Sequence, residues 1–527
     1  MKSSLALSAE PVLAAARRLF WLSTWLLWVP MAVYITGLNR GHSLGVLQAA
    51  LLVVSVVGLA VINAETAVVV FSAQGRDSAQ RRGLMQRLAL ALVPWHRPHP
   101  RAVPPPPLAL PLMATSASPS AVTAAVSPLA PLGSPPLAPL GSSPISPFMS
   151  IVVVAYLPNE QDIIEDTLIH WLTEVTPPTQ GWEIILAYNT PTRLPVEDRL
   201  RDLAWQFPAL VLLPVAHSHS KAENLNAALP VIRGEMVGVF DADHHPAVDC
   251  LSRAWAWLEQ GQYDVVQGRN IIRNAEDNWL TQLIAVEFEC IYGVSHYGRS
   301  LLADTALFAG SNGYWRTAAL RHVGFHHTRL TEDIDATVRG LLGGYRLVHD
   351  PAIVTTELAP DNLRGLWLQR QRWSQGWLEV AGLYLGRVLR SQHLDAAQKP
   401  YWVMMLLFSQ GFYPLVWQVI PMLLSIHLSG SSRDLNFENL NLALMALLTL
   451  SAMLQVAVAM QLRPAHSAYS LRHGLLYCLL SPVFFWLKVL IGMVALVNHL
   501  CGSRVWHVTA RTKSKRNRWM PALRGAK

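Results

Sequence analysis

The stretch Met236-Val237-Gly238-Val239-Phe240-Asp241-Ala242-Asp243 decides the fold of this chain. Its apolar first part predicts a buried β-strand, and its last part puts two carboxylates at the end of that strand. Carboxylate oxygens in such a place can hold Mg²⁺ or Mn²⁺ against a diphosphate. Asp-x-Asp is also common by chance, and a solvated turn after a strand is its ordinary interpretation. The surrounding sequence has to decide between the two.

Short apolar runs alternate with helical stretches around this strand. Strands are predicted at 151–155, 183–187, 211–215, 236–240 and 265–267, and helices at 162–173, 197–207, 222–230 and 250–260. Such alternation is typical of an α/β domain with a mostly parallel, doubly wound sheet. Ligands of these sheets bind beyond the carboxyl ends of the strands, which is where Asp241 and Asp243 fall.

Three further polar signals follow in order along the chain. They are Ser220-Lys221-Ala222-Glu223-Asn224-Leu225-Asn226, Thr331-Glu332-Asp333 and Gln369-Arg370-Gln371-Arg372-Trp373. Gln369 and Arg372 lie one helical turn apart, so both can hold phosphates opposite a metal at the two aspartates. Asp333 is the natural base for an acceptor hydroxyl, and with one base a single inverting displacement is the simpler mechanism. Together the four signals indicate transfer of a sugar from a nucleoside diphosphate.

Two features near these signals allow a second interpretation. Glu332 can raise the pKa of Asp333, or it can belong to an ordinary helix start, for which Thr331 and Asp333 are both suited. His244 and His245 can be metal ligands, but satisfied loop histidines are favoured because hard oxygen ligands suit Mg²⁺.

The composition indicates a protein that is part membrane and part globular. Of 527 residues, 52% are hydrophobic and only 14% are charged, which is too apolar for an ordinary soluble enzyme. Apolar runs long enough to cross a bilayer lie at 19–35, 44–71, 402–426, 440–462 and 475–500. Arginines lie at both outer ends of the first two runs, so the positive-inside bias predicts a hairpin that returns the chain to the cytoplasm. We therefore expect a multi-pass protein of the inner membrane whose middle domain is cytoplasmic.

The number of crossings stays open at this point. Five crossings from a cytoplasmic N-terminus would put the basic stretch 511–518 outside, against the same charge bias. Lys488 lies inside the last run, where a charge is unfavourable. One run can be re-entrant, the last can break at Pro482 or near Lys488, or the charge rule can fail for the tail.

These features divide the chain into an N-terminal membrane hairpin (1–72), a Pro/Ala/Ser-rich linker (73–149), an α/β domain (150–360), a signature and interfacial segment (361–400), C-terminal membrane helices (401–500) and a basic tail (501–527). Residues 377–390 are apolar on one side and basic on the other, which predicts a helix lying in the membrane interface. The net charge of +8 fits contact with anionic membrane lipid, whereas no basic and aromatic pattern indicates nucleic acid. Four scattered cysteines suggest neither a disulfide framework nor zinc.

By these motifs, residues 150–376 resemble the membrane-integrated family 2 glycosyltransferases, the group of cellulose, chitin and hyaluronan synthases, which have a Rossmann-like GT-A fold. The resemblance implies a role for each matching residue. For the donor, the implied sets are Lys221, Asn226 and Asp241 at the nucleotide, Asp243 with Asp241 at the metal, and Asp333, with Glu332 beside it, as the base. For the acceptor side, they are Gln369, Arg372 and Trp373 as the signature linked with processive polymerases, and Ser311 and Asn312 beside the acceptor.

Two positions depart from the family pattern, and both concern the nucleoside. Tyr188 or Asn189 stands where an aspartate is usual, and the motif after the first strand is stretched by two residues as Tyr156-Leu157-Pro158-Asn159-Glu160. Asn189 and Glu160 are still expected at the nucleotide.

The resemblance implies an inverting transferase that uses a UDP-sugar to extend a β-linked polysaccharide at the membrane. Two alternatives stay open. One is a transferase that adds a single sugar to a lipid carrier, and the other is an inactive partner subunit that binds a nucleotide. The sequence indicates neither the sugar, nor the linkage, nor any export partner.

Overall fold

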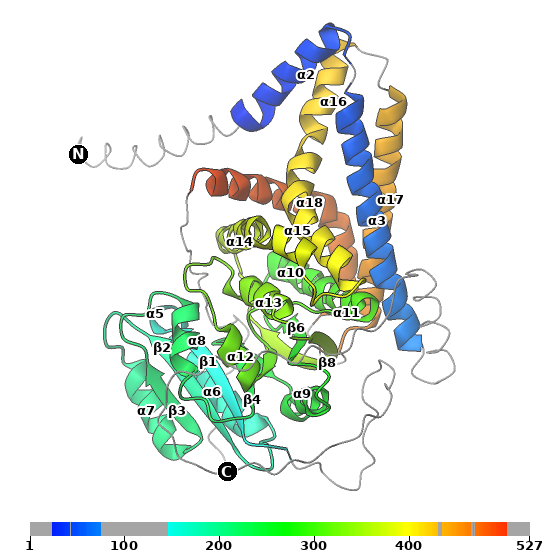
Figure 1. Cartoon of the computed structure of the whole chain (residues 1–527). Helices are drawn as coiled ribbons and strands as arrows, with labels where there is room; N and C mark the ends of the chain where they lie inside the picture. The colour runs from blue at the N-terminus through cyan, green and yellow to red at the C-terminus, as the bar shows by residue number, and fades with distance from the viewer. Residues whose placement is uncertain are drawn as a thin grey trace, which may run out of the picture.

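The computed structural model describes residues 24–42, 44–74, 146–430, 435–464, 467 and 469–502. An α/β domain lies at one end of the molecule and long helices rise from it (Figure 1). Most of the expected linker and nearly all of the expected basic tail lie outside the described residues.

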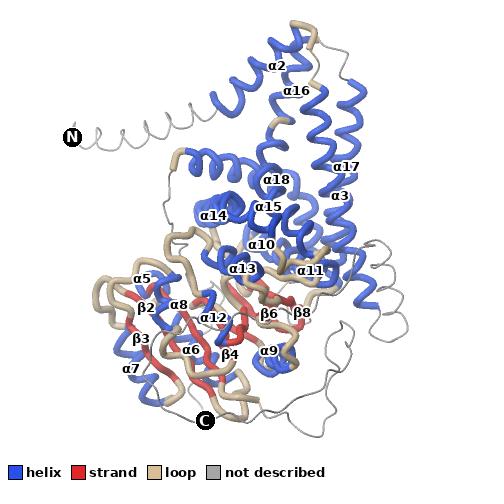
Figure 2. Tube along the Cα trace, viewed as in Figure 1, coloured by secondary structure: helices blue, strands red, loops and turns tan. Residues whose placement is uncertain are grey.

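The α/β domain is built on a single eight-stranded sheet, whose strands are red in Figure 2. In chain order the strands are β1 (Met149–Tyr156), β2 (Trp182–Asn189), β3 (Leu210–Pro214), β4 (Met236–Asp241), β5 (His245–Pro246), β6 (Val265–Ile272), β7 (Gly313–Arg316) and β8 (Leu347–Glu357). Their order in the sheet is β3-β2-β1-β4-β7-β6-β8-β5. The first four of that order are parallel, β7 is antiparallel to both β4 and β6, and β5 is antiparallel to β8. The predicted α/β class is confirmed, and the sheet is mixed because β5 and β7 run against the others.

Both faces of this sheet are buried, which explains its continuous apolar runs. Successive side chains of β1 enter two different cores, because side chains alternate along a strand. Ile151 and Val153 join one core with helices α6 (Ile164–Glu174), α7 (Val196–Gln206) and α9 (Cys250–Glu259). Val152 and Val154 join the other with α8 (Lys221–Ala228), α12 (Thr317–Val323) and α13 (Glu332–Leu342). A one-turn helix, α5 (Leu157–Glu160), follows β1.

A second layer of helices covers the end of the sheet toward the long helices. The chain 279–303 forms α10 (Trp279–Phe288), a π-helix (Glu289–His296) and α11 (Tyr297–Ala303) in succession. After β8, α14 (Leu363–Arg390) runs beneath the long helices (Figure 1). The segment 377–390, expected as an interfacial helix of its own, is thus continuous with the signature at 369–373.

Among the described residues, four helical segments are long and apolar enough to cross a membrane: Gly45–Ser72, Gly411–Ser429, Asn439–Gln461 and Leu471–Leu500. They belong to α3 (Gly45–Gln74), to α15 (Gln398–Trp417) with α16 (Val419–Ser429), to α17 (Leu435–Gln461) and to α18 (Leu471–Leu500). The first predicted crossing begins outside the described residues, and its described part, Leu26–Asn39, is shorter than a span. It comprises a π-helical turn (Thr24–Trp28) and α2 (Val29–Asn39).

The last long helix settles one of the open points of the sequence. α18 continues through Pro482 and Lys488 without a break. The Lys488 ammonium lies 2.9 Å from Oε1 of Glu287, a residue of α10. The charge inside this apolar run therefore has a carboxylate partner on the helical layer that covers the sheet.

Candidate active site

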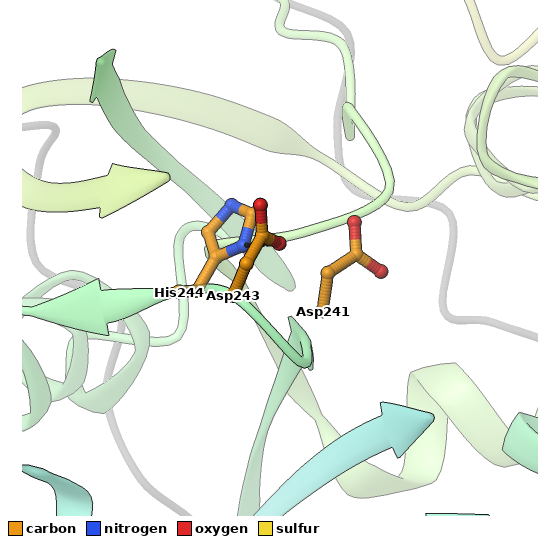
Figure 3. Close-up of side chains that lie close together, drawn as sticks. All are labelled: Asp241, Asp243 and His244. Atoms are coloured by element: carbon orange, nitrogen blue, oxygen red, sulfur yellow. Dashed lines mark hydrogen bonds and ion pairs between the residues drawn. The ribbon is translucent and has the colours of Figure 1, made fainter. Parts of the chain in front are cut away.

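The two aspartates of the Asp-x-Asp lie where β4 ends, and Figure 3 shows their carboxylates pointing in the same direction. Asp241 is the last residue of β4, and its backbone N–H donates to the Ser311 hydroxyl at 3.1 Å. Asp243 is buried and accepts a hydrogen bond from the backbone N–H of Leu358 at 3.0 Å. Asp241, Asp243 and His244 each offer a ligand atom within 4.8 Å of the others. By geometry this group can hold a divalent ion.

Both ring nitrogens of His244 already contact carboxylates. Its Nδ1 lies 3.2 Å from Asp243 Oδ1 and its Nε2 lies 2.9 Å from Glu357 Oε2. Burial lowers the pKa of His244, but its hydrogen bonds to Asp243 and Glu357 outweigh burial and raise that pKa to about 9. We infer that His244 is a buried cation that ties the end of β4 to the end of β8. His245 instead stacks on the ring of His170, at 4.6 Å between centroids.

Lys221 joins the aspartates to the rest of the site. It is the first residue of α8, whose N-cap Ser220 accepts a hydrogen bond from the backbone N–H of Glu223 at 3.2 Å. The Lys221 ammonium pairs with Asp241, donates to the Gly310 carbonyl at 2.6 Å and lies 3.9 Å from Glu332 Oε1. Burial lowers the pKa of Lys221, but the nearby carboxylates, Asp241 foremost, outweigh burial and raise it.

Asp333 lies close to Gly310, the residue whose carbonyl accepts from Lys221. It lies in the first turn of α13, and one of its oxygens accepts from the backbone N–H of Ile334 at 2.9 Å. Gly310 has a φ of +83°, and a Cβ there would come within 2.9 Å of Asp333 Oδ2 and 3.4 Å of Lys221 Nζ. Burial and then the neighbouring Glu332 raise the pKa of Asp333 to about 7, although Lys221 and Arg372 act in the opposite direction. A carboxyl group with such a pKa can take up a proton near neutral pH.

The signature helix α14 packs directly on the loop that precedes α13 and Asp333. Arg372 donates from Nη1 to the Leu330 carbonyl at 3.1 Å. Gly376 lies so close to Thr331 that a Cβ would come within 2.3 Å of its side chain. Gln369 is buried, and its Oε1 has no hydrogen-bond partner among the described residues. The structure therefore brings Arg372, Asp333, Lys221 and Asp241 together through direct or shared contacts.

Of the residues expected near the acceptor, Ser311 lies beside Asp241, whereas Asn312 and Trp373 contact other protein groups. The Ser311 hydroxyl supports the end of β4, so Ser311 lies beside Asp241. Asn312, with a φ of 52°, turns its amide inward and donates to Asn270 Oδ1 at 3.2 Å. Trp373 lies on α14 with the guanidinium of Arg370 4.2 Å from its ring centroid.

The residues expected near the nucleoside are mostly engaged with neighbouring protein groups. Glu160 accepts from the backbone N–H of Tyr156 at 2.7 Å, and Asn189 accepts from Asn224 Nδ2 at 2.8 Å. The Asn226 amide donates to the Phe325 carbonyl at 2.7 Å and accepts from the Phe325 N–H at 3.0 Å. These hydrogen bonds join Asn226 to the chain after α12, whereas Lys221 pairs with Asp241.

Sequence reasoning missed two residues that shape the site. Glu379 of α14 lies 2.9 Å from Arg329 Nη1 and accepts from the Leu330 N–H at 3.3 Å, just before the Asp333 loop. Asn224 donates to both Asn189 and the Ala155 carbonyl. Asn224 stood inside a quoted motif, but nothing local in the sequence marks Glu379, because its partner lies 50 residues away.

Several known proteins are similar to this chain. Residues 236–495 match the model of glycosyl transferase family group 2. The chain is 29% identical over 287 residues to a β-monoglucosyldiacylglycerol synthase of Trichormus variabilis, covering 53% of this chain and 58% of that relative. It is 26% identical over 273 residues to a poly-β-1,6-N-acetyl-D-glucosamine synthase of Staphylococcus aureus, covering 50% of this chain and 61% of that relative. The chain thus spans about three fifths of the length of these curated relatives.

Among solved structures, the chain is similar to the mannosyltransferase PcManGT of Pyrobaculum calidifontis in complex with GDP-Man and Mn²⁺. That likeness has a TM-score of 0.46 at 20% identity and covers 68% of this chain and 88% of the other.

Proposed function

The chain belongs to the family 2 glycosyltransferases, and we propose that it transfers a hexose from a UDP-sugar, with inversion, to an acceptor at the membrane surface. One observation carries the proposal. Lys221 contacts both Asp241 and the Gly310 carbonyl, while Gly310 approaches Asp333 so closely that a side chain would not fit. The expected donor-binding carboxylates and the expected base therefore face one shared space.

Asp241 and Asp243 suit a hard divalent ion, Mg²⁺ or Mn²⁺, because both offer carboxylate oxygens at the end of β4. His244 is a poor ligand for it, since both ring nitrogens already contact carboxylates. When bound, such an ion supplies positive charge that stabilises the departing diphosphate. Lys221, which pairs with Asp241, adds a protein cation at the same place.

Asp333 accepts the proton of the acceptor hydroxyl in the proposed mechanism. Its burial and the adjacent Glu332 keep its pKa near neutrality, which makes it a stronger base than an exposed aspartate. Arg372, held by the Leu330 carbonyl, adds positive charge on the side of α14. One base and one attack at the sugar carbon give a single displacement, so the product has the inverted configuration.

For the acceptor, we propose a growing β-linked polysaccharide. The signature residues Gln369, Arg372 and Trp373 support this choice, as does the similarity to the poly-N-acetylglucosamine synthase. A membrane lipid is the second candidate, favoured by the 29% identity to a synthase whose name specifies a glucosylated diacylglycerol. The four membrane-type helices suit either acceptor. We place the α/β domain on the cytoplasmic side of the inner membrane because of the basic flanks of the first two apolar runs.

The test is incorporation of labelled sugar by the purified full-length chain in detergent. UDP-glucose, UDP-N-acetylglucosamine and UDP-galactose are offered in turn with Mg²⁺ or Mn²⁺, and the label is divided into lipid extract, polymer and free sugar. A long polymer supports the first acceptor, and a single-sugar lipid supports the second.

Two site variants and one control accompany this measurement. We expect Asp243→Asn and Asp333→Asn each to lose on the order of 10²-fold or more in turnover. Asp202→Asn, an exposed aspartate on α7, should behave like the parent protein. Full turnover in both site variants would contradict the assignment of these carboxylates.

A further inference from the structure

A buried ionic cluster lies where the signature helix meets the last membrane-type helix. Glu287 of α10 lies 2.5 Å from Arg370 Nη2 on α14 and 2.9 Å from Lys488 Nζ on α18. The side chains of Glu287 and Arg370 are 7% and 9% exposed, and that of Lys488 is 26% exposed. One carboxylate thus lies between two cations from different helices.

The cluster reaches the signature tryptophan through Arg370. The Arg370 guanidinium lies 4.2 Å from the ring centroid of Trp373, one turn along α14, and 5.8 Å from that of Phe288. It therefore lies between Glu287 and the indole, and it orients the indole through a cation–π contact. Lys488 in turn lies 5.0 Å from the ring centroid of Phe484 on its own helix.

The surroundings of the cluster are apolar. Phe288, Phe484, Val286 and Leu487 belong to one hydrophobic cluster with Trp373 at its edge. Apolar contacts alone tolerate small shifts between helices, whereas a buried charge is strongly unfavourable unless its partner stays in place. The pairing of Glu287 with both cations therefore specifies how α10, α14 and α18 fit together.

The two cations also hold Glu287 ionised. Burial raises the pKa of Glu287, but Arg370 and Lys488 outweigh burial and keep the pKa below its ordinary value. These two cations therefore favour the charged carboxylate, which contacts α14 and α18 at once.

We propose that Lys488, Glu287 and Arg370 are positioning residues that fix Trp373 relative to Asp333, so that the acceptor hydroxyl rather than water receives the sugar. This inference rests on the proposed function, because it assumes that Trp373 lies on the acceptor side. None of the three residues is assigned to the donor or to the proton transfer. A fault in the cluster should therefore change where the sugar goes more than how the donor binds.

The test compares transfer with donor hydrolysis in Lys488→Met. The purified chain receives whichever labelled UDP-sugar of the panel gives the highest turnover, with the membrane acceptors that support it. We expect the ratio of label in product to label in free sugar to fall about tenfold, while the donor KM stays within about twofold of the parent. Lys488→Arg, which keeps the charge, should restore most of the ratio. Arg472→Met, which removes an exposed cation from the same helix, should leave it unchanged.

Glu287→Gln provides the second variant. It removes the charge that both cations share, so its ratio should fall further than that of Lys488→Met. UDP titration of each variant reports whether the donor site is folded. A Lys488→Met protein with the parent ratio would overturn the inference, as would equal losses of transfer and hydrolysis. A parent protein that neither builds product nor releases sugar would instead contradict the proposed function.

Discussion

At the scale of single residues, the proposed mechanism depends on one carboxyl group, Asp333, whose burial raises its pKa. Asp333 is enclosed by Gly310 and lies next to Glu332, and together burial and this neighbour raise its pKa to about 7. The positive charges of Lys221 and Arg372 limit the rise. Removing the Glu332 carboxylate should lower the pKa of Asp333, and removing one of the two cations should raise it.

The pH dependence of activity follows from this value. Because the base acts when deprotonated, kcat/KM of the parent should increase as the pH rises through about 7. Glu332→Gln removes the carboxylate that disfavours ionisation, so its rising limb should move to lower pH. The free energy of unfolding should change with pH in the opposite direction to the activity. The raised pKa of Asp333 stabilises the folded state below the ordinary pKa of an aspartate, and this stabilisation is lost as the pH rises through about 7. A limb that moves to higher pH in Glu332→Gln would contradict the account.

A side chain at position 310 is unfavourable for two reasons, one in the backbone and one in the surrounding atoms. Its φ of +83° is unfavourable for other residues, and a Cβ would approach Asp333 and Lys221. We expect Gly310→Ala to lower the free energy of unfolding by about 1 kcal/mol or more and to reduce turnover strongly. The matched control is Gly382→Ala in α14, where a Cβ meets nothing within 4 Å. It should raise the free energy of unfolding by about 0.5 to 1 kcal/mol, measured by denaturant titration in detergent.

At the scale of elements, the proposed base and the signature belong to one unit, made of the loop before α13, the first turn of α13 and the middle of α14. Three contacts join them: Arg372 to the Leu330 carbonyl, Gly376 against Thr331, and Glu379 to Arg329 and the Leu330 N–H. Asp335 continues this contact, since it accepts from Tyr384 of α14 at 2.7 Å. A shift of α14 would therefore displace Asp333.

Removing Glu379 tests this unit. Glu379→Ala leaves Arg329 without its nearer carboxylate, and Asp335 remains at 3.6 Å. Because Glu379 is buried while Arg329 is partly exposed, we expect a loss of about 2 kcal/mol in the free energy of unfolding and a lower kcat. Glu379→Gln, which can still accept both hydrogen bonds, should lose less of each. Equal effects of the two variants would show that the volume of the side chain, not its hydrogen bonds, holds the loop.

Elements with strong local signals could be predicted from the sequence, and elements defined by distant contacts could not. The strand before Asp241 was predicted because its apolar run is local, and the four predicted helices of the α/β domain lie within a few residues of α6, α7, α8 and α9, whereas α10, α11 and α12 were not predicted. Strands β5, β7 and β8 were not predicted, and the antiparallel direction of β7 follows only from its pairing with β4 and β6. In the structure, Lys221 pairs with Asp241, and Gly310, which accepts from Lys221, lies against Asp333. By contrast, the engagement of Asn226 with Phe325 depends on a contact across 99 residues that no motif reveals.

At the scale of the whole molecule, several polar contacts join the long helices to the α/β domain. Glu287 pairs with Lys488 of α18, and Arg269 of β6 donates to the Leu462 carbonyl just after α17 at 3.1 Å. On α3, Glu65 accepts from Tyr401, which in turn accepts from Arg299 Nε of α11 at 3.0 Å. These contacts run from the long helices or the residue after one of them to the helical layer or to β6 of the sheet, so they stabilise the packing of the long helices on the α/β domain.

The Glu65 contact gives a prediction at this scale. Glu65→Ala removes the carboxylate that balances the buried Arg299, so the thermal midpoint of the detergent-purified chain should fall by several degrees. Glu174→Ala, on the exposed surface of α6, is the control and should leave the midpoint unchanged. An identical midpoint in both variants would mean that Tyr401 and Arg299 satisfy each other.

The pairing of Lys488 with Glu287 limits what protein engineering can do with this chain. A water-soluble version that ends near residue 400 lacks Lys488. Of the two cations that contact Glu287, only Arg370 would remain. Exchanging the C-terminal segment for an unrelated membrane anchor would do the same. The α/β domain is therefore not independent of the membrane-type helices. A chimera that keeps the α/β domain also has to keep α18, which carries Lys488.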